Sequence, residues 1–110
     1  MLTVAEEVLI VFTTWPDAET ARAAARTLIE EKLAACANLL PGVESIYRWK
    51  GAIETSSEVL ALFKTTRDRV DALERRLLAL HPYEVPEFIT VRVNDGLPAY
   101  LRWVEQSCLG

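Results

Sequence analysis

The segment HPYEVPE, residues 81–87, brings an imidazole, a phenol and two carboxylates close together in the chain. Pro82 and Pro86 disfavour helical dihedral angles at the residues that precede them, so we expect the segment to be extended. No other segment of the sequence is so rich in polar side chains, so it is the first candidate for a functional site.

Cys36 is the candidate thiol, because Cys108 lies at the end of the chain. In the topology derived below, we expect the end of the second helix and the start of the second strand to meet at one end of the sheet. We hypothesise that Cys36 and His81 converge there.

These residues also have ordinary structural explanations. A cysteine in an apolar stretch such as AACANLL is most often a small buried side chain. A histidine at the C-terminus of a helix can donate to the last carbonyls and interact favourably with the helix dipole. Tyr83 can simply pack the connection, and Glu84 and Glu87 can be solvated. A Cys-His hydrolase needs an orienting third group and an oxyanion site, and the sequence shows neither.

The composition is that of one ordinary globular domain, residues 1–110. The 12 basic and 16 acidic residues give a net charge of −4, which disfavours nucleic acid and anionic lipid as partners. The first residues carry acidic side chains where a signal peptide would be basic, and their apolar run is too short for a membrane span. Two cysteines fit a reducing compartment. We therefore expect a cytoplasmic protein.

The apolar, β-branched run at residues 7–14 predicts a buried strand. Asp17 is placed to cap a helix that follows. Residues 35–40 and 43–50 predict one long strand, kinked at Pro41-Gly42, and Lys50-Gly51 predicts a turn into a third strand at residues 52–64. This hairpin is longer than one small sheet needs.

Thr65 is the predicted cap of a second helix, which should end at His81. Residues 88–93 predict a fourth strand, and Pro98 fits the first turn of a final helix, with Tyr100 facing inward. The order β-α-β-β-α-β plus a terminal helix predicts an α+β, ferredoxin-like fold: an antiparallel sheet with two helices on one face and an extra C-terminal helix. The predicted core is Leu9, Val11, Leu28, Ile29, Val59, Ala61, Phe63, Leu73, Leu77, Ile89, Val91 and Val93.

Two long motifs resemble the CutA family of divalent-cation tolerance proteins. One is the run CANLLPGVESIYRW, which starts at Cys36, and the other is HPYEVPE; the AYLRWV stretch at residues 99–104 is similar as well. The resemblance implies a tight homotrimer in which the long hairpin strands pair between subunits, similar in architecture to PII-type signalling proteins. Pairing would also protect an edge that would otherwise promote aggregation.

The family is also associated with copper tolerance and metal binding. A thiolate suits Cu(I), and an imidazole with a carboxylate suits Cu(II) or Zn(II). One cysteine, one histidine and one glutamate make an incomplete metal shell, so a neighbouring subunit, water or another ligand would have to complete it. Carried over to this sequence, the resemblance places Cys36, Lys64, His81, Tyr83 and Glu84 in a functional cleft. It assigns assembly to the hairpin residues Tyr47, Arg48, Trp49 and Glu54.

Two functions are compatible with the sequence. The first is a non-enzymatic trimer that binds copper or another divalent cation, with Cys36, His81 and Glu84 as ligands, and contributes to metal tolerance. The second is a PII-like sensor or scaffold that binds a small anion or a partner protein in the cleft between subunits, with Lys64 and Arg48 as counter-charges.

Overall fold

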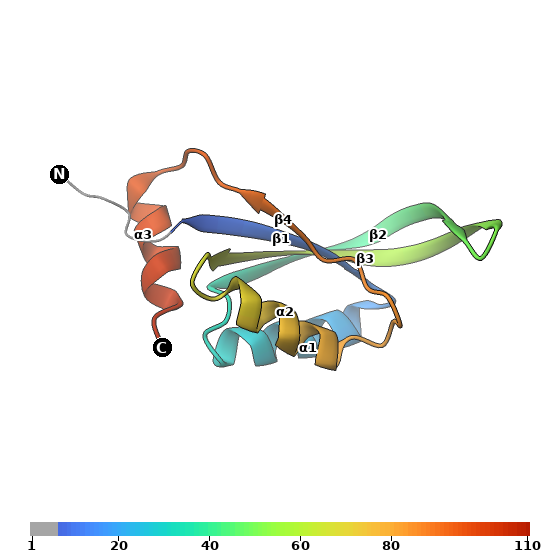
Figure 1. Ribbon diagram of the computed structural model, residues 1–110, viewed down its shortest axis with the longest axis horizontal. Coiled ribbons are helices and arrows are strands. Elements are labelled where there is room, and N and C mark those ends of the chain that lie inside the picture. Colours follow the sequence, from blue (N-terminus) through green and yellow to red (C-terminus); the bar gives the residue numbers. More distant parts are fainter. Residues whose placement is uncertain (1–6) are drawn as a thin grey trace.

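A computed structural model describes residues 7–110 as a four-stranded antiparallel sheet with three helices. The strands are β1 (Val8–Trp15), β2 (Cys36–Trp49), β3 (Ala52–Thr66) and β4 (Ile89–Arg92), in the spatial order β2-β3-β1-β4. The helices are α1 (Ala18–Glu30), α2 (Val70–Leu80) and α3 (Pro98–Ser107). Both α1 and α2 cover one face of the sheet (Figure 1). The α+β, ferredoxin-like prediction is confirmed.

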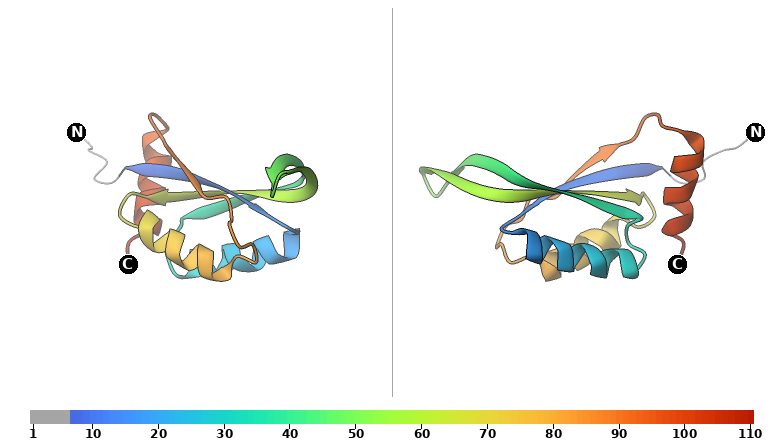
Figure 2. Two further views of the ribbon diagram at one scale, coloured as in Figure 1. Left: turned by 45° about the vertical axis from the view of Figure 1, so that its right-hand side comes forward. Right: turned by 180° about the vertical axis from the view of Figure 1, so that it is seen from behind.

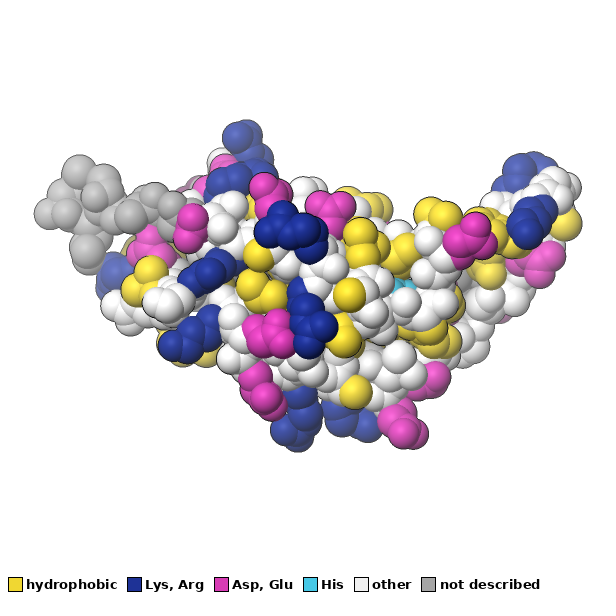
Figure 3. All heavy atoms as spheres, turned by 60° about the horizontal axis from the view of Figure 1, so that its bottom comes forward, with side chains coloured by type: hydrophobic (Ala, Val, Ile, Leu, Met, Phe, Trp, Pro, Cys, Tyr) yellow, Lys and Arg dark blue, Asp and Glu magenta, His cyan; other side chains and the backbone are white. Residues whose placement is uncertain are grey.

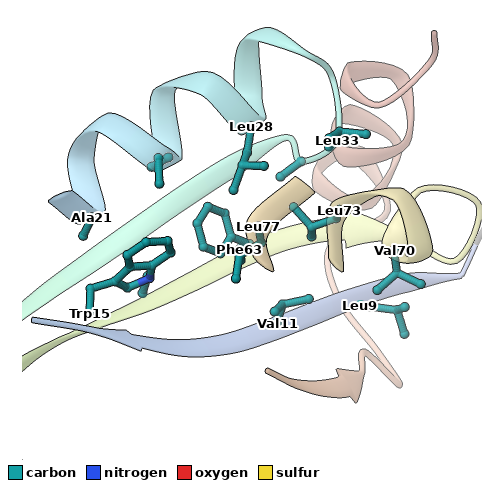
Figure 4. Close-up of a cluster of buried hydrophobic side chains, with 14 of the residues drawn as sticks. Leu9, Val11, Trp15, Ala21, Leu28, Leu33, Phe63, Val70, Leu73 and Leu77 are labelled. Atoms are coloured by element: carbon teal, nitrogen blue, oxygen red, sulfur yellow. The ribbon is translucent and has the colours of Figure 1, made fainter. Parts of the chain in front are cut away.

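The core lies between that face and the two helices. Alternate residues of β1 and β3 point toward it, and α1 contributes small alanines that let the helix approach the sheet closely (Figure 4). Because burial of apolar side chains is the main driving force of folding, this layer fixes the arrangement of the sheet and helices. Its fully buried members include Leu9, Val11, Trp15, Ala21, Leu28, Ala61, Phe63, Leu73 and Leu77.

The β2-β3 hairpin projects well beyond the rest of the sheet (Figures 1 and 2). Its turn is tight, with Lys50 at φ 49° and Gly51 at φ 83°. Positive φ at both central residues is the geometry of a type I′ turn, whose twist matches that of the flanking strands. The predicted kink is also confirmed, because the β2-β3 register shifts between Leu40 and Val43, around Gly42 at φ 77°. The turn and the bulge therefore give the long arm its shape.

The helix starts agree with the sequence in one case and differ in the other. Asp17 caps α1, and its side chain accepts a hydrogen bond from the Thr20 amide at 2.7 Å. Thr65 was the wrong cap for α2, because it belongs to β3 and its hydroxyl donates to the Leu33 carbonyl at 2.7 Å. The α2 helix begins after Arg69, which makes no side-chain capping bond.

The predicted core is wrong for Ile29, Ile89 and Val91, and Val93 is only partly buried, against a small second cluster. Ile29 lies on the solvent side of α1. Ile89 and Val91 pair with Phe12 and Ile10, whose side chains point away from the helices. The period of two in a strand identifies an apolar side of β4, but it does not tell which face of the sheet that side joins.

That second face of the sheet is apolar and has no helix across its centre (Figure 2). We call it the open face. Its residues are paired across the four strands, so that they share one side. Ile89 is 53% exposed and Val91 is 45% exposed. The apolar members are Ile10, Phe12, Leu40, Leu60, Leu62, Ile89 and Val91.

The α3 helix stands at the end of the sheet away from the hairpin arm (Figure 1). Pro98 occupies its first turn, as predicted, where a missing N–H costs nothing. Val104 is buried and packs with Val8, Ala35 and Cys108 in a small second cluster. The predicted inward orientation of Tyr100 is wrong, since this side chain is 40% exposed. No helix within residues 7–110 is long and apolar enough to cross a membrane.

Candidate functional site

The HPYEVPE segment forms one wall of a groove of about 680 Å³. Residues 45–49 of β2, which lead up to the turn of the β2-β3 arm, form most of the other wall. Hydrophobic side chains gather on the surface where the arm leaves the body (Figure 3). A concavity of this size is typical of small-molecule sites. Its lining residues are Thr14, Ser45, Ile46, Tyr47, Trp49, Glu58, Pro82, Tyr83, Glu84, Val85 and Glu87.

His81 ends α2 and is buried, 8% exposed. Its ring stacks on Trp15, with the ring centres 4.1 Å apart. The Tyr83 amide donates to Nδ1 at 3.1 Å, so the proton lies on Nε2, which donates to the Thr14 carbonyl at 2.8 Å. Burial lowers the pKa of His81, against the opposing effects of the Thr14 carbonyl and Glu58. The imidazole is therefore neutral, and it fixes the first turn of the extended segment.

Tyr83 is held in turn by a buried carboxylate. Its hydroxyl donates to Glu58 at 2.5 Å, and Glu58 is only 7% exposed. Burial, and then the Glu58 carboxylate, raise the pKa of Tyr83. Burial also raises the pKa of Glu87, and the nearby Glu58 adds to this shift. The phenol thus stays protonated and can act only as a donor to Glu58 at neutral pH.

Cys36 lies at the other end of the molecule. It begins β2 on the same side of the sheet as the open face, opposite Lys64 in the ladder. Its sulfur is 3.6 Å from the Tyr100 hydroxyl, a contact that raises the pKa of Tyr100 to about 12. Lys64 donates a hydrogen bond to the side chain of Asn38. The thiol is half-buried rather than a fully enclosed core side chain.

The hypothesis that Cys36 and His81 converge is wrong within one chain. The ladder places Cys36 beside Lys64 and Ile10, whereas His81 contacts Thr14, roughly 13 Å further along β1 at ~3.3 Å per residue. The reason is the direction of α2. The helix starts near the end of β3, beside Cys36, and runs back along the sheet, so its C-terminus lies at the opposite end.

A single chain therefore does not supply the predicted metal shell. Glu84 lines the groove, Cys36 is distant from it, and both ring nitrogens of His81 are already hydrogen-bonded. Within residues 7–110, no three His, Cys, Asp or Glu side chains are grouped so that they could hold a metal ion. Lys64 and Tyr83, predicted to share a cleft, are likewise on different parts of the molecule. The ligand assignment stays a prediction for an assembly of chains.

The motifs and the geometry can be compared with known proteins. The family described as CutA1 divalent ion tolerance protein matches residues 9–107. The chain belongs to the CutA1 family. It is 44% identical over 102 residues to the divalent-cation tolerance protein CutA of Thermus thermophilus, a match that covers 93% of this chain and 97% of that protein.

Solved CutA structures have the same fold. The CutA crystal structure from Xylella fastidiosa matches with a TM-score of 0.90 at 48% identity, covering 92% of this chain and 97% of that one. The mouse protein CutA is 48% identical over 95 residues, which is 86% of this chain. The chain spans only 54% of the length of that mouse relative.

The hairpin residues assigned to assembly by the CutA resemblance lie on the projecting arm. Tyr47 pairs with Glu54, Arg48 with Ile53, and Trp49 with Ala52. The Tyr47 hydroxyl is 2.9 Å from the Ser56 hydroxyl. Tyr47 and Trp49 are 42% and 43% exposed. Large aromatic side chains so exposed on an arm are suited to contact another molecule.

Sequence analysis did not identify two residues that are important for the site, Glu58 and Trp15. Glu58 was assigned only to the third strand, and the predicted first strand ended before Trp15, which in the structure is the last residue of β1. A glutamate just before the apolar run VLALF was a signal for Glu58, because its neighbours are buried. The position of Trp15 against His81 depends on packing between β1 and α2, which pattern alone does not reveal. Trp15 Nε1 has no hydrogen-bond partner in the part of the chain described.

Proposed function

We propose that this CutA1-family chain works as a homotrimer that contributes to divalent-cation tolerance and has no enzymatic activity. The observation that supports assembly best is the open face. Ile89 and Val91 turn toward it, while Thr90 and Arg92 occupy the helix side of β4. A monomer gains nothing from placing apolar side chains away from its core, whereas an assembly that covers this face buries them.

The projecting arm supports the same proposal. Its outer residues Ile46 and Ile53 are 66% and 62% exposed, although they lie on paired strands. The outer edge of β2 exposes backbone groups that another chain can pair with. Pairing between copies would satisfy these groups and shield the apolar tip.

Metal binding in this proposal depends on assembly. Copper, or another divalent cation, would take ligands from more than one chain, because Cys36 and His81 are separated within one chain. A thiol, an imidazole and a carboxylate remain chemically suitable donors for copper. A metal ion that binds His81 must replace the hydrogen bond of that ring nitrogen to Thr14 or Tyr83. This cost favours weak, regulatory metal binding over a permanent metal centre.

Calorimetric titration of the purified protein with copper tests this function, with the assembly state followed by light scattering. We expect copper to bind the trimer, and Cys36→Ala to weaken binding without changing the fold. Tyr100→Phe is a matched control that keeps the thiol but removes its hydroxyl neighbour. Identical isotherms for wild type and Cys36→Ala would exclude the thiol as a ligand.

A second function, anion binding by a PII-like sensor, is favoured by one observation. Lys64 lies beside Cys36 on the side of the open face and has a neutral partner, Asn38, rather than a carboxylate. In a trimer, three such lysines would concentrate positive charge. Titration with inorganic phosphate, and its loss in Lys64→Ala, separates this function from copper binding.

We also propose a cytoplasmic location. Both cysteines are free thiols, which fits a reducing compartment. Fractionation of cells that produce the protein tests this, and recovery in an oxidising compartment would contradict it. An Archaeoglobus fulgidus relative with a solved structure is described as periplasmic.

A further inference from the structure

Two buried polar atoms of β1 have no hydrogen-bond partner. They are the Thr13 hydroxyl oxygen and the Trp15 indole nitrogen Nε1, and within residues 7–110 no other buried side-chain nitrogen or oxygen is left unpaired. Both side chains are 0% exposed, so bulk water does not reach them. An unpaired polar atom in the interior costs stability, and for this reason nearly all buried polar groups in proteins are paired.

The two atoms belong to one small region of the core. Thr13 and Trp15 are two residues apart on one strand, so their side chains point to the same side of the sheet. They pair with Ala61 and Val59 of β3, which lie in the core beneath α1 and α2. The Trp15 ring lies below α1, and its nitrogen is on the edge that is turned away from this helix and toward the strands (Figure 4).

We propose that one internal water molecule binds between Thr13 and Trp15. The indole N–H would donate to the water oxygen, and the Thr13 hydroxyl, which can both donate and accept, would form the second hydrogen bond. Buried waters typically make about two to four hydrogen bonds to groups that the protein leaves unpaired, and these two side chains supply two. The proposal is independent of metal binding and of assembly, because this region lies on the helix side of the sheet and not on the open face.

The water would hold the indole ring on which His81 stacks. The ring centres of Trp15 and His81 are 4.1 Å apart, and the angle between the ring planes is 29°. His81 in turn fixes the start of the HPYEVPE segment through the Thr14 carbonyl and the Tyr83 amide. A hydrogen bond at Nε1 restricts the tilt of the indole, and so it restricts the imidazole that rests on it. Thr13 is therefore a positioning residue, which acts on the segment through the water and Trp15.

Two alternatives lead to different observations. In a dry core, both atoms stay unpaired, and replacing the Thr13 hydroxyl by a methyl group of the same shape removes a cost and does not lower stability. In the second alternative, the side chains rotate so that the indole N–H donates directly to the Thr13 hydroxyl. In the structure these two atoms do not bond each other.

A crystal structure of the full chain tests the site directly. We expect one ordered water in the core, with its oxygen about 2.7–3.2 Å from both Trp15 Nε1 and Thr13 Oγ1. Crystals of Thr13→Val should lack this water, whereas Thr13→Ser keeps the hydroxyl and should retain it. A wild-type structure with no water at this position, or with a direct bond between the two side chains, would overturn the proposal whether or not the variants fold.

Urea unfolding gives the sign of the effect in solution. Thr13→Val should unfold at a lower urea concentration than the wild type, because the water loses one of its two partners. Thr55→Val makes the same substitution at an exposed position of the arm and should unfold like the wild type. An unchanged or higher midpoint for Thr13→Val would indicate a dry core and contradict the proposal.

NMR signals test the positioning role, which a purely local effect on stability would not reveal. In Thr13→Val the indole N–H signal of Trp15 should move upfield, because the proton loses its hydrogen bond, and the ring signals of His81 should move with it. Thr13→Ser should restore both sets of signals. Trp49 and Trp103 are 43% and 45% exposed, and their indole signals serve as internal references that should not move. Unmoved His81 signals in Thr13→Val would show that the water does not position the imidazole.

Discussion

The Tyr83 hydroxyl donates to the buried Glu58 carboxylate at 2.5 Å and so joins the HPYEVPE segment to strand β3. The neighbouring His81 fixes the same segment to β1 through the Thr14 carbonyl. Two polar bonds to two different strands therefore hold a connection that has no regular secondary structure. They determine the position of one wall of the groove.

Removing the Tyr83 hydroxyl should destabilise the protein. Tyr83→Phe leaves Glu58 buried without its donor, and we expect a loss of about 1–3 kcal/mol in the free energy of unfolding. Urea denaturation followed by circular dichroism measures it. Tyr100→Phe is the matched control, because Tyr100 is more exposed and contacts only a thiol, a weak partner. Equal losses of unfolding free energy in the two variants would show that the Tyr83–Glu58 hydrogen bond stabilises the protein no more than the Tyr100–Cys36 contact does.

His81 should make stability depend on pH. Its pKa is lowered from the usual 6.5 on folding, so the unfolded chain binds the proton more readily. The stability it contributes is present above about pH 6.5 and is lost as the pH falls through the folded pKa. We expect the urea concentration at the unfolding midpoint of the wild type to decrease as the pH is lowered from about 7.5 to about 5.5, measured with a chelator present.

His81→Gln provides the comparison for this pH dependence. Glutamine does not titrate, so the variant should be less stable at about pH 7.5 but lose less on acidification. Glu87 has the opposite effect on the pH dependence of stability, because its pKa is raised from the usual 4.5 on folding. The pH range of the measurement therefore stops at about pH 5.5, before Glu87 dominates. Parallel pH profiles for wild type and His81→Gln would assign the acid sensitivity to other groups.

Much of the fold follows from sequence because it depends on local rules. The cap at Asp17, the turn at Lys50-Gly51 and the end of α2 at His81 are each set by residues within a few positions. The face that β4 presents is different. Ile89 and Val91 turn away from the helices, and the period of two in the strand does not determine which face they join.

The candidate site was only partly predictable for the same reason. The prolines of HPYEVPE predict an extended segment, and the segment does line a groove. The partners Glu58, Trp15 and Thr14 come from strands far away in the sequence, and no periodicity connects them to His81. The error about Cys36 arose from the direction of α2, which determines the end of the sheet that His81 reaches.

The hydrogen bond of Thr65, which was predicted to be a helix cap, can be tested by substitution. Its hydroxyl donates to the Leu33 carbonyl in a buried position, and it does not cap α2. Thr65→Val keeps the shape of the side chain but leaves that carbonyl unpaired, so we expect a loss of about 1 kcal/mol in unfolding free energy. The exposed Thr55→Val on the arm is the control and should change stability little. A helix-capping role would instead shorten α2, which amide hydrogen exchange detects.

The open face is the strongest test of assembly. Ile89→Lys places a charge on the β4 edge of the apolar surface that we propose is covered by other copies. Burying that unpaired charge is costly, so we expect the variant to dissociate to monomers in light scattering while its circular dichroism spectrum is kept. Leu78→Lys makes the same change on the outer side of α2, where Leu78 is 45% exposed. It should remain trimeric. Dissociation of both variants, or of neither, would contradict assembly through the open face and would leave the projecting hairpin as the surface to test, with Tyr47→Pro breaking its strand pairing.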